Sequence, residues 1–191
     1  MNFFQSRLAR SIVPTLGQRR CQDIVSKIQP HLNTSASIID IGCGIGQVAH
    51  ALKTFGHQLT TIDVVDICLY PDLKPRLYNG HRLPYAGRSF DVALLITVLH
   101  HTPEPLELIL EARRIARQLI IMEDVYTNRL NQKLTCFMDV LLNPESATHP
   151  HTNKTDKTWR ETFAAQDLKL THHQIDTFWH LFSSATYVLD S

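Results

Sequence analysis

Three glycines and two aspartates in the first third of the chain have the spacing of a nucleotide-cofactor site. Gly42, Gly44 and Gly46 alternate with other residues directly after a β-branched run, and an apolar pattern of helical period follows them. A glycine loop between a strand and a helix exposes bare backbone and unpaired N–H groups to a ligand. Asp40 precedes this loop by two residues, and Asp63 ends the next apolar run. These residues predict a site for a nucleotide cofactor.

The spacing distinguishes between classes of cofactor. The dinucleotide fingerprint G-x-G-x-x-G would require glycine at position 47, where the chain has Gln47, and this disfavours a nicotinamide dehydrogenase. Asp40 at a strand end, beside exposed carbonyl groups, suits a cationic ligand better than a pyrophosphate. Asp63 lies about 20 residues beyond the first glycine, where a carboxylate can accept hydrogen bonds from both ribose hydroxyls of an adenosine cofactor.

Two motifs in this region match a known family. The segment D-I-G-C-G-I-G at residues 40–46 resembles the first motif of class I S-adenosylmethionine-dependent methyltransferases. The segment N-G-H-R-L-P-Y-A-G-R-S-F-D at residues 79–91 resembles the D-(A/G)-x-x-L-P-F-x-x-x-S-F-D segment of their small-molecule (type 11-like) branch. The resemblance covers residues 37–189. It implies methyl transfer from S-adenosylmethionine to a small-molecule acceptor by in-line attack on the sulfonium methyl, with S-adenosylhomocysteine as the product.

The resemblance also implies which residues hold the cofactor. In the family, the acidic residue of the second motif and the amide after it hold the adenine edge, and Val64 would pack on the adenine ring. The residue at the acidic position here is Asn79, which can still present a carbonyl oxygen and an N–H group. The predicted cofactor-binding residues are Asp40, Ile41, Gly42, Cys43, Gly44, Gly46, Asp63, Val64, Asn79, Gly80, His81 and Thr97.

Polar residues at the ends of two later strands are candidates for the chemical step. The carboxyl ends of parallel strands meet at the crevice where ligands bind. We predict His100 as a general base for a substrate hydroxyl, because imidazole titrates near neutral pH. For His101 the alternative is a structural role as a helix cap. For Glu123 the alternative is a solvated acid pair with Asp124. The predicted substrate contacts are His101, Glu123, His149 and His151.

The order of apolar patterns predicts an α/β fold. We expect a Rossmann-like, seven-stranded, mostly parallel sheet with helices on both faces and an antiparallel C-terminal hairpin. A single domain of residues 1–191 is predicted, divided into N-terminal helices that form a lid (1–36), a cofactor-binding half (37–124), and substrate-side helices with the closing hairpin (125–191). The strands are predicted at residues 37–41, 58–63, 76–78, 91–97, 118–123, 168–176 and 181–189, and the later helices at 47–55, 105–117, 130–141 and 157–166.

The first 22 residues contain arginines and no acid. Helical spacing predicts one helix that is interrupted at Pro14 and a second that ends before Pro30. An interfacial membrane helix or a transit peptide is one interpretation of such a basic amphipathic start. We favour a helix that packs on the domain and partly covers the active site.

Composition excludes several other functions. The net charge of +1 and the lack of a basic stripe interleaved with aromatic residues argue against a nucleic-acid partner. The four cysteines have no C-x-x-C spacing, which argues against zinc or a disulfide framework and is typical of a cytoplasmic protein. We therefore expect no metal site. We also expect a monomer or a homodimer. A catalytically silent S-adenosylmethionine-binding partner or regulatory subunit is the alternative function, because Asn79 replaces the usual acid.

Overall fold

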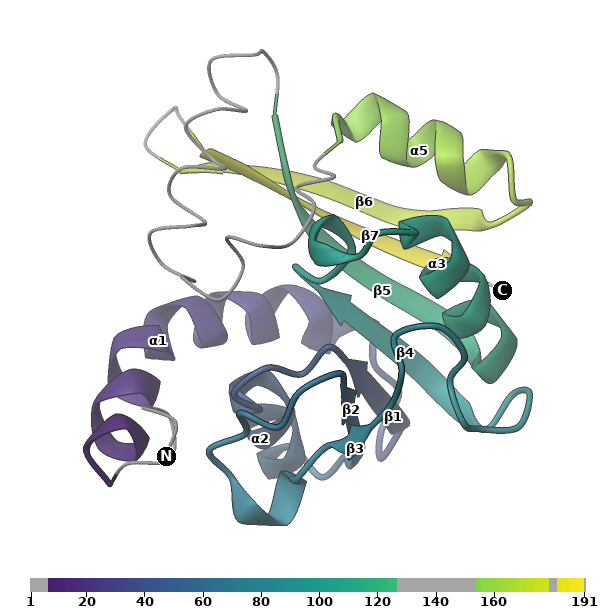
Figure 1. Cartoon of the computed structure of the whole chain (residues 1–191). Coiled ribbons are helices and arrows are strands. Elements are labelled where there is room, and N and C mark those ends of the chain that lie inside the picture. The colour runs from purple at the N-terminus through teal and green to yellow at the C-terminus, as the bar shows by residue number, and fades with distance from the viewer. Residues whose placement is uncertain (1–6, 127–153, 179–181, 191) are drawn as a thin grey trace.

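The chain forms one seven-stranded sheet flanked by helices, as the computed structural model in Figure 1 shows for residues 7–126, 154–178 and 182–190. The strand order is β3-β2-β1-β4-β5-β7-β6. Neighbouring strands from β3 to β5 are parallel, whereas β7 is antiparallel to both β5 and β6. The predicted fold class is therefore confirmed. The strands are β1 (Ser37–Ile41), β2 (Gln58–Asp63), β3 (Arg76–Leu77), β4 (Phe90–Ile96), β5 (Ala116–Val125), β6 (Lys169–Phe178) and β7 (Phe182–Asp190).

The helices cover both faces of the sheet, because successive side chains of a strand point to opposite faces. In β1, Ile39 and Ile41 pack in a core cluster that includes side chains of α3 and α5, and Ile38 packs in a second cluster with side chains of α1 and α2. The helices are α1 (Arg7–Ile28), α2 (Gln47–Thr54), α3 (Pro105–Ile115) and α5 (Asp156–Ala164), with short 3-10 helices η2 (Gln29–His31), η3 (Pro71–Leu73) and η4 (Leu99–His101).

The N-terminal helix differs from the prediction. α1 runs from Arg7 to Ile28 without a break at Pro14, so the two predicted helices are one. A proline inside a helix removes one hydrogen bond and costs about 3 kcal/mol. The second half of α1 buries Cys21, Ile24, Val25 and Ile28 against the sheet and α2, and this packing offsets such a cost.

Helix α3 and strand β1 explain the second motif. Glu111 accepts a hydrogen bond from the Leu83 N–H at 2.9 Å, and Arg114 donates to the carbonyl oxygens of Leu83 and Tyr85 at 2.8 and 2.7 Å. Asp91, the last residue of the motif, accepts from the Ser37 N–H and hydroxyl at 2.9 and 2.6 Å. Leu83 and Phe90 are buried. Glu111 and Arg114 of α3 and Ser37 of β1 therefore hold the second motif in place.

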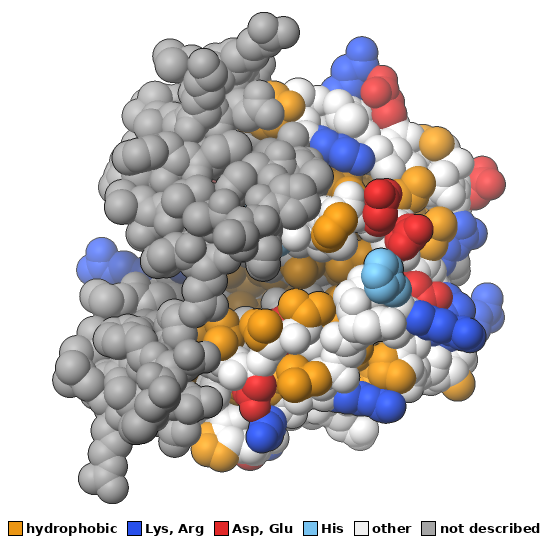
Figure 2. All heavy atoms as spheres, viewed as in Figure 1, with side chains coloured by type: hydrophobic (Ala, Val, Ile, Leu, Met, Phe, Trp, Pro, Cys, Tyr) orange, Lys and Arg blue, Asp and Glu red, His pale blue; other side chains and the backbone are white. Residues whose placement is uncertain are grey.

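Several predictions fall outside the described residues. These are the helix at 130–141 and the substrate contacts His149 and His151. Among the described helices, none combines the length and the apolar character that crossing a membrane requires. On the face shown in Figure 2, acidic, basic and hydrophobic side chains are interspersed over the described surface.

Candidate cofactor site

The glycine loop between β1 and α2 has a backbone that side chains would disturb. Gly42, Gly44 and Gly46 all have positive φ, at 73°, 51° and 78°. A Cβ atom at Gly42 would lie 2.3 Å from Val98 Cγ2, and one at Gly46 would lie 2.6 Å from Cys68 Sγ. A Cβ at Gly44 would meet no heavy atom within 4 Å. The loop is therefore packed behind its first and third glycines and open in front of the second.

Asp63 at the end of β2 holds this loop. Its Oδ2 accepts a hydrogen bond from the Gly44 N–H at 2.8 Å, and its Oδ1 accepts from the Val64 and Val65 N–H groups at 2.7 and 3.3 Å. Asp63 is buried. The predicted aspartate thus lies beside the open glycine, and the pairing joins the two motif positions in space.

Asp40 gives the site its electrostatic character. The side chain is almost fully buried at the end of β1. Burial, and then the nearby carboxylate of Asp63, raise the Asp40 pKa to about 7. Burial followed by the charges of Asp40 and Asp63 also raises the Cys43 thiol pKa, so that thiol stays protonated. A cation bound nearby would be stabilised, because both acidic groups are buried and poorly solvated.

Two of the predicted adenine-side residues, Val64 and Gly80, lie side by side. Val64 is about half exposed, and a Cβ built at Gly80 would lie 3.6 Å from Val64 Cγ1. The structure therefore brings the predicted apolar contact next to the second motif. Asn79 Oδ1 accepts from the His81 N–H at 3.1 Å, so the Asn79 side chain shapes the turn at Gly80.

Thr97, directly after β4, is strained. Its φ is 52°, a left-handed conformation that is unusual for a β-branched residue. The Thr97 N–H donates to the Met122 carbonyl oxygen at 2.7 Å, which ties the turn to β5. Strained residues of this kind concentrate at functional sites. Val98 follows it and packs against Gly42, so this turn also supports the glycine loop.

His100, on η4, and Glu123, near the end of β5, form a buried pair. His100 Nδ1 lies 2.6 Å from Glu123 Oε2, and Glu123 Oε1 accepts from the Leu99 N–H at 2.8 Å. Glu123 has no exposed surface, and His100 is 2% exposed. The alternative of a solvated acid is therefore wrong for Glu123, because its carboxylate points inward to η4. The His101 ring packs at a tilt against that of His100, with the two ring centroids 4.0 Å apart.

Sequence reasoning missed the residues that support the loop from behind. Val98, Cys68 and Tyr70 pack against Gly42 or Gly46, and the Leu69 N–H donates to the Ile45 carbonyl oxygen at 3.1 Å. These residues carry no motif of their own. The only available signal was the requirement that something fill the space beside a glycine.

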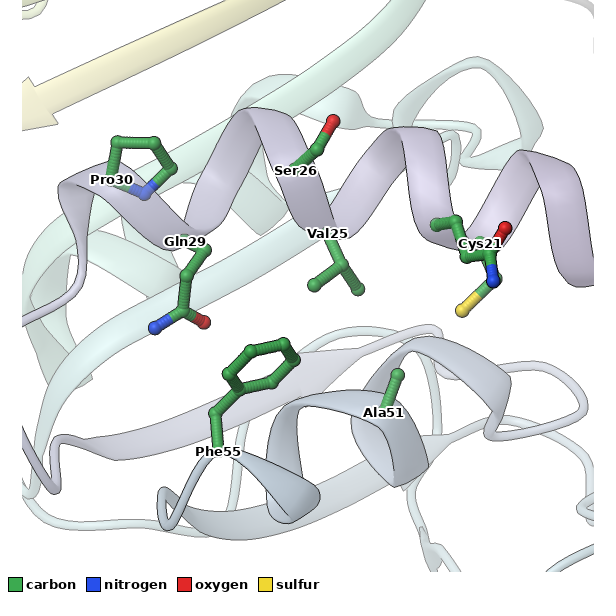
Figure 3. Close-up of a pocket in the computed structure, with 8 residues that line it drawn as sticks. Cys21, Val25, Ser26, Gln29, Pro30, Ala51 and Phe55 are labelled. Atoms are coloured by element: carbon green, nitrogen blue, oxygen red, sulfur yellow. The ribbon is translucent and has the colours of Figure 1, made fainter.

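A hollow lies apart from these residues. A mainly apolar cavity of about 590 Å³ separates α1 from α2, and Figure 3 shows Cys21, Val25 and Gln29 facing Ala51 and Phe55 across it. None of the predicted cofactor or substrate residues lines it. Within the described parts of the chain, no cluster of three or more His, Cys, Asp or Glu side chains could hold a metal ion.

Comparison with known proteins decides the family. A family model described as a methyltransferase domain matches residues 15–173, which is most of the chain. The chain belongs to the class I S-adenosylmethionine-dependent methyltransferases. Among curated proteins, a ubiquinone biosynthesis O-methyltransferase from Stutzerimonas stutzeri (strain A1501) is 30% identical over 97 residues. That match covers 44% of this chain and 42% of the relative, so it spans less than half of the length of either protein.

Solved structures share the fold of this methyltransferase. A SAM-dependent methyltransferase from Methanosarcina mazei has a TM-score of 0.66 at 18% identity, covering 85% of this chain and 96% of that one. The PH0226 protein from Pyrococcus horikoshii OT3 has a TM-score of 0.64 at 14% identity, covering 99% and 93%. The [4+2]-cyclase SpnF has a TM-score of 0.68 at 14% identity, covering 91% and 80%. The last example shows that the fold alone does not determine the reaction.

The residues of this methyltransferase suit its cofactor, S-adenosylmethionine. The space in front of Gly44 is open. Asp63 adjoins that space and interacts with the nearby Asp40. The two acidic groups favour a ligand with positive charge, as a sulfonium and an ammonium group provide. Exposed Val64 offers an apolar surface to an aromatic ring. The site chemistry and the family therefore agree.

Proposed function

We propose that this methyltransferase transfers the methyl group of S-adenosylmethionine to a hydroxyl group of a small-molecule acceptor. The observation that carries this proposal is the pair of His100, on η4 shortly after β4, and Glu123, near the carboxyl end of β5. An imidazole backed by a carboxylate is a suitable base for removing a hydroxyl proton. The name of the Stutzerimonas relative, an O-methyltransferase, supports the choice of oxygen.

The cofactor would supply an already activated methyl group, so the chain's own residues mainly bind, orient and exclude water. In this proposal Asp63 accepts from the ribose hydroxyls, Val64 packs on the adenine ring, and Asn79, Gly80 and His81 hold the adenine edge. The open backbone at Gly44 and the buried Asp40 hold the cationic methionine end. The full proposed set is the one predicted from the sequence: Asp40, Ile41, Gly42, Cys43, Gly44, Gly46, Asp63, Val64, Asn79, Gly80, His81 and Thr97.

His100 would take the acceptor proton. The same proposal keeps His101, His149 and His151 as candidate substrate contacts. Glu123 is removed from that set, because it has no exposed surface and its two carboxylate oxygens are engaged by Leu99 and His100. The interspersed charges of the surface in Figure 2 support a small acceptor over a nucleic acid.

Methyl transfer can be tested without knowing the acceptor. Purified protein is incubated with S-adenosylmethionine labelled on the methyl group and with a fractionated small-molecule extract, and labelled products are identified by mass spectrometry. We expect label in a methoxy group of a compound with a free hydroxyl precursor, and loss of that label with H100Q. Label on carbon, nitrogen or sulfur would refute the hydroxyl acceptor.

A catalytically silent S-adenosylmethionine-binding subunit is the second candidate. The engagement of Asn79 Oδ1 by the His81 N–H favours it, because that oxygen then has less capacity for the adenine amino group. This candidate predicts cofactor binding without turnover of any acceptor. Labelled product from the isolated chain would exclude it.

A further inference from the structure

The carboxylate of Glu123 uses both of its oxygens on the short helix η4. Oε1 accepts from the Leu99 backbone N–H at 2.8 Å, and Oε2 lies 2.6 Å from His100 Nδ1. Because a backbone N–H can only donate, the role of Oε1 is fixed. Oε2 is then the atom that faces the imidazole.

Complete burial makes this arrangement demanding. Glu123 has no exposed surface, and burial raises the pKa of its carboxyl group, although the hydrogen bond and charge of His100 oppose this effect. A buried carboxyl group is costly unless its oxygens are matched by donors. The Leu99 N–H is one such donor, and a proton on His100 Nδ1 is the other.

Other titratable groups surround the pair on each adjoining element. His101 packs against His100 from η4, Asp124 follows Glu123 on β5, and Tyr187 faces Glu123 from β7. The Tyr187 hydroxyl donates to Asp156 at 2.9 Å, so it is directed away from the Glu123 carboxylate. The charge of Asp124 raises the Glu123 pKa, and this effect is smaller than those of burial, His100 and the Leu99 N–H. Among these side chains, His100 has the largest effect on the pKa of Glu123.

We propose that Glu123 is the positioning residue of His100: it holds the imidazole with the proton on Nδ1, so that the basic lone pair lies on Nε2. This inference rests on the proposed function, in which His100 takes a proton from the acceptor. The same carboxylate anchors η4 through Leu99, and η4 directly follows Thr97 and Val98, the turn that supports the glycine loop. Glu123 thereby connects the geometry of the base to the geometry of the cofactor loop.

Replacement of Glu123 by glutamine gives a decisive change. The side-chain amide of the E123Q variant would have one acceptor oxygen instead of two. If that oxygen accepts from the Leu99 N–H, the amide NH₂ group must face His100 Nδ1 as a donor, and the imidazole can match it only with a lone pair on Nδ1. The proton must then move to Nε2. A role of Glu123 confined to accepting the Leu99 N–H would not predict this switch of tautomer.

The experiment is a histidine ¹⁵N NMR titration of the full chain. The His100 resonance is assigned as the one that disappears in H100Q, and H101Q is the matched control. We expect Nδ1 of neutral His100 to carry the proton in the wild type and Nε2 to carry it in E123Q. The titration midpoint of His100 should fall by about 1 pH unit or more in E123Q, since the carboxylate no longer stabilises the cation. An Nε2–H tautomer in the wild type would overturn the proposal, even if E123Q does not fold. So would an unchanged tautomer in folded E123Q.

Calorimetry on the same samples separates this inference from the proposed function. We expect S-adenosylhomocysteine to bind E123Q within about threefold of the wild type, and, once an acceptor is known, kcat to fall while KM for the acceptor is kept. If the tautomer result holds but no acceptor is methylated, the proposed function fails and the positioning does not. If E123Q methylates the acceptor at the wild-type rate with the switched tautomer, the positioning role in catalysis is overturned.

Discussion

Substitution of Gly44 by alanine tests whether the open face of the glycine loop is the cofactor site. Gly44 has φ of 51°, and a Cβ there would touch no protein atom within 4 Å. Gly56, after α2, has φ of 86° and is equally open. A left-handed alanine costs about 1–2 kcal/mol at either position. G44A and G56A should therefore lose similar stability, which corresponds to a fall in Tm of roughly 2–8 °C for a domain of this size.

The two variants should differ in binding. The added methyl group of G44A enters the space that the cofactor is proposed to fill, and overpacking of this kind costs about 1–3 kcal/mol, or roughly a 5- to 150-fold weaker Kd. G56A places its methyl group away from the loop and should bind like the wild type. Calorimetric titration with S-adenosylhomocysteine, combined with thermal unfolding, measures both effects. Equal affinity of G44A and G56A would refute the placement of the cofactor at Gly44.

Three further predictions concern stability. The folded-state pKa of Asp40, about 7, is above the ordinary 3.8, so the folded state holds this proton more tightly than the unfolded state. The free energy of unfolding should therefore fall as pH rises from 4 to 7, by no more than about 4 kcal/mol. D40N should flatten that slope in denaturant unfolding at a series of pH values. T97G should keep the free energy of unfolding or raise it by up to about 1 kcal/mol, because glycine relieves the strain of the left-handed backbone at position 97. A clear fall in the free energy of unfolding, measured in urea, would show that the strain is absent. W159A should lower the free energy of unfolding by about 3–5 kcal/mol, because Trp159 is fully buried. W159F should lower it by less than half of that, because Trp159 Nε1 finds no hydrogen-bond partner within the described part of the chain. Equal losses for the two variants in urea unfolding would contradict this.

The contacts at the C-terminal end of α1 are of a kind that sequence prediction does not detect. Pro14 is a helix-breaking signal when only neighbouring residues are considered. Lys27 Nζ of α1 lies 3.0 Å from Asp176 Oδ2 of β6, and the His31 ring packs against that of His172 with the ring centroids 4.3 Å apart. These contacts join residues that are about 140–150 positions apart in the chain, and they hold the end of α1 regardless of local preference.

The glycine loop shows how much a motif can predict. The β-branched run, the three glycines and Asp63 were enough to locate the loop, its flanking strand and helix, and the acidic residue beside it. They sufficed because steric limits on φ and the alternation of strand side chains operate over a few residues. The second motif did not reveal the Glu111 and Arg114 side chains that hold it, because both lie on α3, further along the chain.

By itself, the sequence determined the class of fold, the ends of β1 and β2, and the family to which the methyltransferase belongs. Those properties depend on local spacing and on residue types that few other backbones require. The tertiary structure alone decided that Glu123 faces His100, that Val98 and Cys68 fill the space behind the glycines, and that Thr97 is strained. These features arise where the carboxyl ends of separate parallel strands converge, so the partners are distant in sequence and no periodicity links them.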